Sequence, residues 1–131
     1  MVVFINFRHS KELKIMKLYG IPNCNTVKKA QDWLKSNENE YEFHDFKKRG
    51  ITAEKLTEWF AAFGWEKVVN RAGLTFKKLS KEEQTAINSA DTAIAYLMSN
   101  TSAIKRPILE LNGKPVLLGF KEDEYQALFT K

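Results

Sequence analysis

One cysteine, Cys24, is the residue in this chain best suited to covalent chemistry. It follows the short apolar run Lys17-Leu18-Tyr19 and the turn residues Gly20-Ile21-Pro22-Asn23, and it directly precedes a segment with helical spacing. We therefore expect Cys24 in the first turn of a helix, where free backbone N–H groups and the positive end of the helix dipole favour a thiolate. A thiolate is the nucleophile in thiol–disulfide exchange.

Three neighbours, Asn25, Thr26 and Lys28, are predicted to stabilise that thiolate. Thr26 offers a hydroxyl donor, and Lys28 brings positive charge within about one helical turn. The competing interpretation is a lone cysteine packed in the core as a small hydrophobic residue. The polar, turn-forming residues on both sides of Cys24 argue against burial, so a reactive thiol is favoured.

A single cysteine also limits what this thiol can do. It excludes an intramolecular disulfide and a zinc site built on several thiolates. Position 27 is valine, so there is no C-x-x-C pair and no resolving thiol within the chain. Turnover would need an outside thiol, and we expect glutathione as co-substrate, with no tightly bound cofactor. Low cysteine usage indicates a reducing compartment, so we expect a cytoplasmic protein.

A second candidate is Arg106, in the sequence Lys105-Arg106-Pro107 ahead of a predicted strand. A lone arginine is usually a solvated surface residue, and a proline at the start of a strand is a harmless turn in the simplest interpretation. Arg106 is a candidate because of the expected strand order. The start of this strand should lie beside the loop that follows the first strand. Arg106 would then face Cys24 and bind an oxyanion or carboxylate with its planar fork.

Asn70 and Arg71 form a third candidate, in the segment Asn70-Arg71-Ala72-Gly73-Leu74-Thr75. One interpretation is a capped turn with an exposed arginine. The other is a second anion contact over the cysteine loop. The residues alone do not separate the two.

The elements that must position these residues follow the order of the thioredoxin fold. Strand, helix and strand over 17–46 form a βαβ unit, and capped helices are predicted from Thr52 to Phe63 and from Ser80 to Ile87, with a further helix around Leu97. Asn112-Gly113 between two apolar runs predicts a type I′ hairpin, and 122–129 a closing helix with Tyr125, Leu128 and Phe129 inward. We expect an α/β thioredoxin-like protein with a four-stranded mixed sheet and a helical insertion between its βαβ and ββα halves.

The chain length of 131 residues suits one domain, and 44% hydrophobic with 28% charged residues is typical of a globular protein. Residues 1–15 are interpreted as a poorly ordered N-terminal extension to a domain over 16–131, with an added edge strand at Val2–Phe7 as the alternative. The net charge of +5 favours anionic partners. We expect neither a membrane segment nor direct nucleic-acid binding.

From Met16 to about Phe129 the sequence resembles the ArsC-like family, which contains arsenate reductases, Spx regulators and YffB-type proteins, and it is most similar to the YffB branch. The resemblance rests on four segments in order: residues 17–30 around Cys24, then 70–75, then Ile104-Lys105-Arg106-Pro107, then 113–120. It implies a thioredoxin fold with a helical insertion, a nucleophilic Cys24, an anion-binding Arg106 and a cis-proline at Pro107. It also implies a family arginine near Asn70 and Arg71.

The resemblance favours a glutathione-dependent thiol reductase acting on a disulfide or oxyanion substrate. The alternative is a non-catalytic regulator that binds RNA polymerase, as the Spx branch does. Arsenate reduction is less favoured, because the third oxyanion arginine of arsenate reductases should fall near Leu118-Gly119 and is missing. The C-x-x-C switch of many Spx regulators is also absent.

Overall fold

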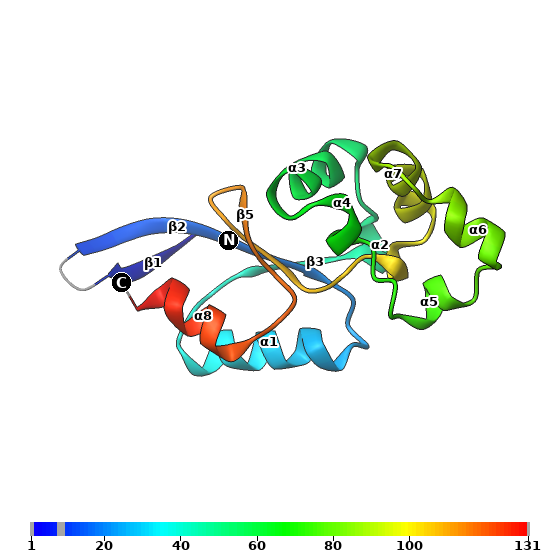
Figure 1. Cartoon of the computed structure of the whole chain (residues 1–131). Helices are drawn as coiled ribbons and strands as arrows, with labels where there is room; N and C mark the ends of the chain where they lie inside the picture. The colour runs from blue at the N-terminus through cyan, green and yellow to red at the C-terminus, as the bar shows by residue number, and fades with distance from the viewer. Residues whose placement is uncertain (1, 8–9, 131) are drawn as a thin grey trace. The chain divides into compact units, whose positions relative to one another are not determined.

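The computed structural model describes residues 2–7 and 10–130, with side chains described from Ile15 onward (Figure 1). The chain divides into two compact units. Unit 1 comprises Met1–Asp45 and Arg106–Lys131, and unit 2 comprises Phe46–Lys105. Cys24 and Arg106 therefore belong to the same unit, although 81 positions separate them in the sequence.

Unit 1 is built on a mixed β-sheet. The central strand β2 (Ser10–Gly20) pairs in parallel with β3 (Glu42–Asp45) and antiparallel with β4 (Ile108–Leu111). Strand β5 (Lys114–Leu118) then pairs antiparallel with β4. These four strands confirm the predicted α/β fold with its four-stranded mixed sheet.

An additional strand, β1 (Val2–Phe7), pairs antiparallel with the first half of β2. The structure thus places an edge strand where we favoured a poorly ordered extension, because β-prone residues at 2–7 find a partner strand in residues 10–15. The division of the chain at residue 15 into extension and domain stays a prediction.

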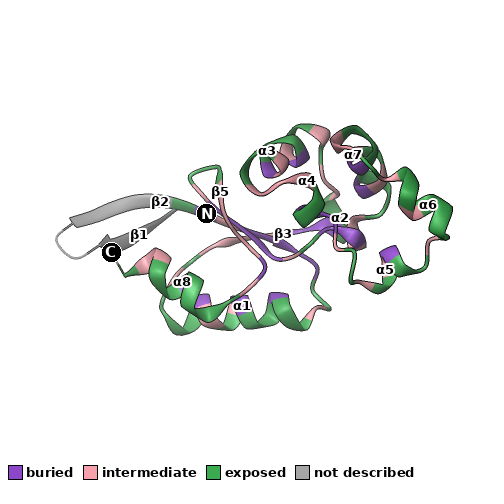
Figure 2. Cartoon of the chain, viewed as in Figure 1, coloured by how far each residue is buried: buried purple, intermediate pink, exposed green. Residues whose placement is uncertain are grey.

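Two helices, α1 (Asn25–Ser36) and α8 (Glu122–Phe129), pack on the same core of unit 1. Helix α1 buries Val27, Ala30 and Leu34 at the predicted helical spacing, and α8 buries Tyr125 (Figure 2). The core consists of fully buried side chains from both helices and from the two central strands, namely Met16, Leu18, Ala30, Leu34, Leu109 and Tyr125.

The turn between β4 and β5 has the predicted chemistry. Asn112 and Gly113 have φ angles of 53° and 79°, the left-handed values that a type I′ turn needs. The Asn112 side chain also accepts a hydrogen bond from the Ile15 backbone N–H at 2.9 Å. The hairpin is therefore tied to the central strand that leads to Cys24.

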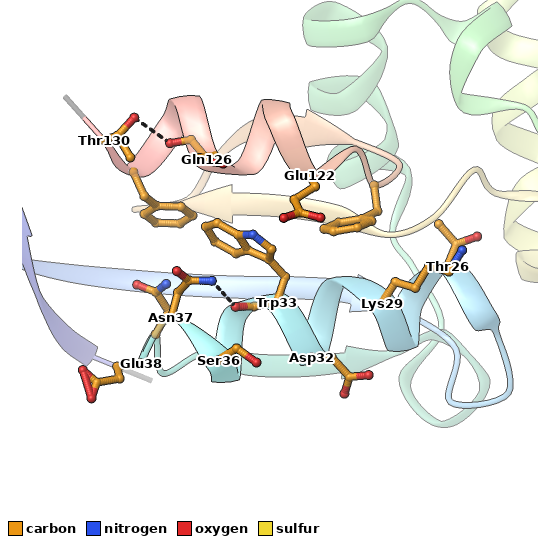
Figure 3. Close-up of a pocket in the computed structure, with 13 residues that line it drawn as sticks. Thr26, Lys29, Asp32, Trp33, Ser36, Asn37, Glu38, Glu122, Gln126 and Thr130 are labelled. Atoms are coloured by element: carbon orange, nitrogen blue, oxygen red, sulfur yellow. Dashed lines mark hydrogen bonds between the residues drawn. The ribbon is translucent and has the colours of Figure 1, made fainter.

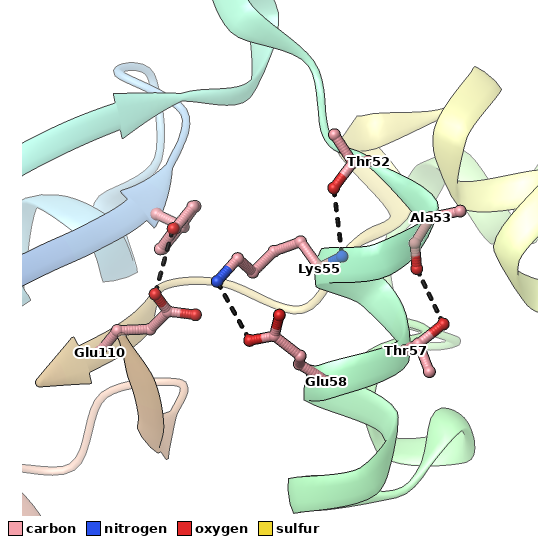
Figure 4. A network of polar contacts seen from close by, with 7 residues as sticks. Thr52, Ala53, Lys55, Thr57, Glu58 and Glu110 are labelled. Atoms are coloured by element: carbon pink, nitrogen blue, oxygen red, sulfur yellow. Dashed lines mark hydrogen bonds and ion pairs between the residues drawn. The ribbon is translucent and has the colours of Figure 1, made fainter. Parts of the chain in front are cut away.

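Unit 2 is helical. Its elements are α2 (Phe46–Arg49), α3 (Ala53–Phe63), α4 (Trp65–Val68), α5 (Leu74–Lys77), α6 (Lys81–Ala86), α7 (Ala90–Ser99) and the 3₁₀ turn η1 (Thr101–Ala103). Thr52 caps α3 by accepting a hydrogen bond from the Lys55 backbone N–H at 3.1 Å (Figure 4). Ser80 and Glu83 form the predicted capping box of α6. Trp59, Leu56, Val68 and Leu97 are fully buried.

One detail of the sequence interpretation is wrong. Phe46 begins helix α2 instead of closing the second strand, because its ring leaves the alternation of β3 and packs edge-on against Trp59 at 6.0 Å. The further helix expected around Leu97 is α7, in which Leu97 is buried and Met98 is 46% exposed.

Candidate active site

Cys24 occupies the N-cap position of α1, directly after the loop that leaves β2. Its backbone is extended (φ −145°, ψ 120°), and its carbonyl oxygen accepts the first helical hydrogen bond, from the Lys28 N–H at 2.9 Å. The cysteine is half-buried, whereas Pro22, Asn23, Asn25 and Thr26 are exposed. The thiol is therefore accessible at the end of a helix, as the sequence predicted.

The first turn of α1 favours the thiolate form of Cys24. The Cys24 side chain makes no capping hydrogen bond of standard geometry. Partial burial raises the pKa of Cys24, but the backbone N–H of Val27, the hydrogen bond and positive charge of Arg106 and the backbone N–H of Thr26 lower it. The net pKa lies below the ordinary value of a cysteine thiol. Thr26 and Val27 are the second and third residues of the helix, whose N–H groups have no partner within it.

Arg106 reaches Cys24 from the other end of the chain. In the sheet, Tyr19 near the end of β2 pairs with Ile108 at the start of β4, so the residues just before β4 lie beside the loop just after β2. Arg106 is half-buried there and donates a hydrogen bond to the Cys24 sulfur. The peptide bond between Arg106 and Pro107 is cis, and the Pro107 carbonyl accepts the Gly119 N–H at 2.8 Å.

Gly20 lets the strand and the helix approach closely at this site. A Cβ atom at position 20 would lie 2.8 Å from Val27 Cγ2 and 3.2 Å from Val27 Cγ1. Only glycine leaves room for the Val27 side chain against the end of β2. Val27, whose amide acts on Cys24, therefore packs in the space that a side chain at position 20 would occupy.

The three predicted thiolate-stabilising residues differ in how they contact Cys24. Thr26 acts through its backbone N–H and not through the predicted hydroxyl. Lys28 is exposed and contacts Cys24 through its backbone N–H, and Asn25 is the exposed first residue of α1. Val27 was missed because only its amide takes part. Its position three residues after the cap was the available signal.

The remaining predicted pair, Asn70 and Arg71, lies in unit 2. The Asn70 N–H bonds to the Ala103 carbonyl at 2.8 Å, and the exposed Arg71 guanidinium lies 5.4 Å from the centre of the Trp65 ring. Both residues therefore have local structural partners. Their role as anion contacts for Cys24 stays a prediction.

A groove of about 1110 Å³ runs between α1 and the start and end of α8 (Figure 3). Helix α1 contributes Thr26, Lys29, Asp32 and Trp33, and the C-terminal segment contributes Phe120, Glu122 and Phe129 among others. The Trp33 and Phe129 rings stack at 5.5 Å. Thr26 joins this groove to the cysteine loop, because its amide acts on Cys24 while the residue lines the groove.

Residues 2–7 and 10–130 were compared with the requirements of a metal site and of a membrane-spanning helix. No group of three or more His, Cys, Asp or Glu side chains in this part of the chain is placed to hold a metal ion. No helix in the same residues has the length and apolar character needed to cross a lipid bilayer.

The fold is that of thioredoxin-like proteins, and comparison with known proteins narrows the class. The sequence profile of the ArsC family matches residues 19–128, so the chain belongs to the ArsC family. The solved structure of a protein named YffB is 45% identical, covers 88% of this chain and 99% of its own, and superimposes with a TM-score of 0.82. An arsenate reductase related protein from Brucella melitensis is 40% identical over 89% of this chain and 96% of its own, with a TM-score of 0.70.

The relatives of this chain also include a protein named as a regulator. The global transcriptional regulator Spx of Streptococcus agalactiae is 27% identical over 119 residues, which is 89% of this chain and 85% of that protein. Relatives with enzymatic and with regulatory names thus align with nearly the whole of this chain.

Proposed function

We propose that this protein is a glutathione-dependent thiol–disulfide reductase in which Cys24 is the nucleophile. The observation that carries the proposal is the arrangement around the sulfur, where two helix amides and the Arg106 guanidinium outweigh partial burial and lower the pKa of Cys24. A larger thiolate fraction at neutral pH increases reactivity toward disulfides. The membership in a family that includes arsenate reductase related proteins supports thiol-based chemistry.

The proposed reaction has two exchanges. The Cys24 thiolate attacks a mixed disulfide between glutathione and a substrate thiol, forming a Cys24–glutathione disulfide and releasing the substrate as a thiolate, which takes up a proton. The thiolate of a second glutathione then attacks the glutathione sulfur of that disulfide. Oxidised glutathione leaves, and the Cys24 thiolate is restored. An external thiol is required because the chain has a single cysteine.

Arg106 has two tasks in this scheme. Before reaction its hydrogen bond and charge stabilise the thiolate. In the mixed disulfide the sulfur is neutral, so the guanidinium is then available to a carboxylate of glutathione. Because the proposed scheme uses reduced glutathione, we propose that the protein works in a reducing compartment, the cytoplasm.

Mass spectrometry and thiol titration test the proposal together. Treatment with oxidised glutathione should add one glutathione to the wild-type protein and none to Cys24→Ser. The rate of alkylation by iodoacetamide should fit a pKa below that of free cysteine. A wild-type protein that gains no adduct, and whose thiol titrates like free cysteine, would contradict the proposal.

A second candidate is an RNA polymerase-binding regulator of the Spx type, favoured by the alignment with Spx over 89% of this chain. Co-purification of polymerase subunits with tagged protein, unchanged by Cys24→Ser, would support this candidate. Loss of the reductase activity in the same variant would then separate the two functions. Arsenate reduction is less favoured because Leu118 and Gly119 stand where a third oxyanion arginine is expected. Arsenate turnover with glutathione and glutaredoxin tests it directly.

A further inference from the structure

We infer that the groove between α1 and α8, here called the α1–α8 groove, binds a basic peptide segment of the substrate, so that the substrates of Cys24 are glutathionylated proteins with Lys or Arg near the modified cysteine. This inference rests on the proposed function, because it names the substrate class of the same thiol. Its docking part is testable without any turnover.

The charge of the groove is opposite to that of the protein. Its lining has three carboxylates, Asp32, Glu38 and Glu122, against one amine, Lys29. The chain as a whole has a net charge of +5. An acidic groove on a basic protein attracts cationic groups and repels anionic ones. A basic segment therefore fits this surface, whereas a nucleic-acid backbone does not.

The groove also offers aromatic surface between its carboxylates. Trp33, Phe120 and Phe129 line it and are only partly buried against the core of unit 1. The Trp33 ring is held in one orientation by Phe129, at 5.5 Å, and by Tyr125, at 5.5 Å with the rings edge-on. Rigid aromatic faces beside carboxylates accept the alkyl stem and the charged head of Lys or Arg, through packing and cation–π contact.

The position of the groove relative to Cys24 sets the spacing in the peptide. Thr26 lines one end of the groove, and two residues of chain span at most about 7 Å to Cys24. Asp32 lies eight residues beyond Cys24 along α1, or about 12 Å along the helix axis. An extended peptide covers that length with about four residues. Asp32 lines the groove from α1 and Glu122 from the start of α8, and Figure 3 shows their carboxylates pointing in different directions. A basic residue about four positions from the reacting cysteine is therefore expected to lie within reach of one of these two carboxylates.

Binding is measured first, with two synthetic peptides that differ only in charge. Each carries a cysteine, and a Lys-Leu-Lys or a Glu-Leu-Glu sequence begins about four residues away. Fluorescence anisotropy with the Cys24→Ser protein should show binding of the basic peptide at least about fivefold tighter than of the acidic one at low salt, and a smaller difference at high salt. Equal binding of the two peptides at low salt would overturn the inference.

Turnover is then measured with the same peptides glutathionylated at their cysteine. The ratio of kcat/KM for the basic over the acidic peptide should exceed one in the wild type. It should fall by about fivefold or more in Asp32→Asn/Glu122→Gln. The matched control Glu40→Gln/Glu124→Gln removes the same charge from exposed residues outside the groove lining, and should keep the wild-type ratio.

The two levels of the hypothesis fail in different ways. A ratio near one in the wild type, or equal ratios in the groove and control variants, would overturn the docking inference while the reductase stands. If the wild type reduces neither peptide but the basic peptide still binds the Cys24→Ser protein preferentially, the reductase proposal fails and the docking of basic segments is supported.

Discussion

The Arg106 side chain donates a hydrogen bond to the sulfur of Cys24, and its charge adds to the effect of that bond on the thiol. The two residues are distant in sequence but adjacent in the sheet, because β4 pairs with β2. This contact makes the reactivity of the cysteine depend on the register of two strands as well as on its own helix.

Replacement of Arg106 by glutamine should raise the pKa of Cys24, because it removes the positive charge and the guanidinium hydrogen bond to the sulfur. The pH profile of iodoacetamide alkylation should move to higher pH, while Arg106→Lys, which keeps the charge but loses the planar fork, should fall between the two. Lys105→Gln removes the same charge from the exposed neighbouring residue and serves as the control. Identical profiles for Arg106→Gln and the wild type would contradict the role of Arg106.

The lowered pKa of Cys24 also predicts how stability depends on pH. In the unfolded chain the thiol keeps its higher, ordinary pKa, so between the folded and unfolded pKa values the unfolded state binds more protons. Stability from this group therefore rises with pH across that interval, is fully present above the unfolded pKa of about 8.5, and is lost as pH falls through the folded pKa.

Urea unfolding of the wild type and Cys24→Ser from pH 5 to 9.5 measures this contribution. The difference in free energy of unfolding should change in favour of the wild type as pH rises toward about 8.5 and should level off above it. A difference that is constant over the whole range would show that the pKa of the thiol is the same in the folded and unfolded states.

The sequence predicts the fold well where local signals coincide. Helical spacing at Val27, Ala30 and Leu34, the cap at Thr52 and the Asn112-Gly113 turn each determine their element through nearby residues, and the structure has all three. The prediction for Phe46 fails for the opposite reason. Its place in the alternating pattern fits a strand, but its buried ring packs on Trp59, a partner that the local sequence does not encode.

The candidate site is predictable to a similar extent. The place of Cys24 at a helix N-terminus and the approach of Arg106 follow from element order and strand pairing. The role of Val27 does not follow from its residue type, because the contact is made by a backbone amide that every residue except proline has. The α1–α8 groove was not predicted at all, since its lining combines α1 with the distant segment 120–130.

Gly20→Ala should destabilise the protein by about 1–3 kcal/mol, because the new Cβ would overlap Val27 Cγ2, 2.8 Å away. The same displacement of the first turn of α1 should raise the pKa of Cys24. The double variant Gly20→Ala/Val27→Ala should lose less stability than the sum of the single variants, because the valine methyl groups are gone. Chemical denaturation of the wild type, the two single variants and the double variant measures this coupling energy. Strictly additive losses of stability would mean that the structure moves to accommodate the new Cβ without strain against Val27.

Two buried tyrosines make a matched pair for the last prediction. The Tyr19 hydroxyl donates a hydrogen bond to Glu110 Oε1 at 3.1 Å, and Glu110 is itself buried. The Tyr125 hydroxyl is buried without a hydrogen-bond partner among the described residues, and burial followed by the Glu124 charge raises the pKa of Tyr125 above its ordinary value.

Loss of the hydroxyl should therefore have opposite effects at the two positions. Tyr19→Phe should lower the free energy of unfolding by about 1–3 kcal/mol, because it takes a donor from a buried carboxyl group. Tyr125→Phe should leave the free energy of unfolding unchanged or raise it by up to about 1 kcal/mol, because it removes a polar atom whose desolvation is not compensated. The urea unfolding midpoints of both variants, compared with that of the wild type, test these two predictions. Equal destabilisation by the two substitutions would mean that the Tyr125 hydroxyl has a partner in solution, such as a bound water.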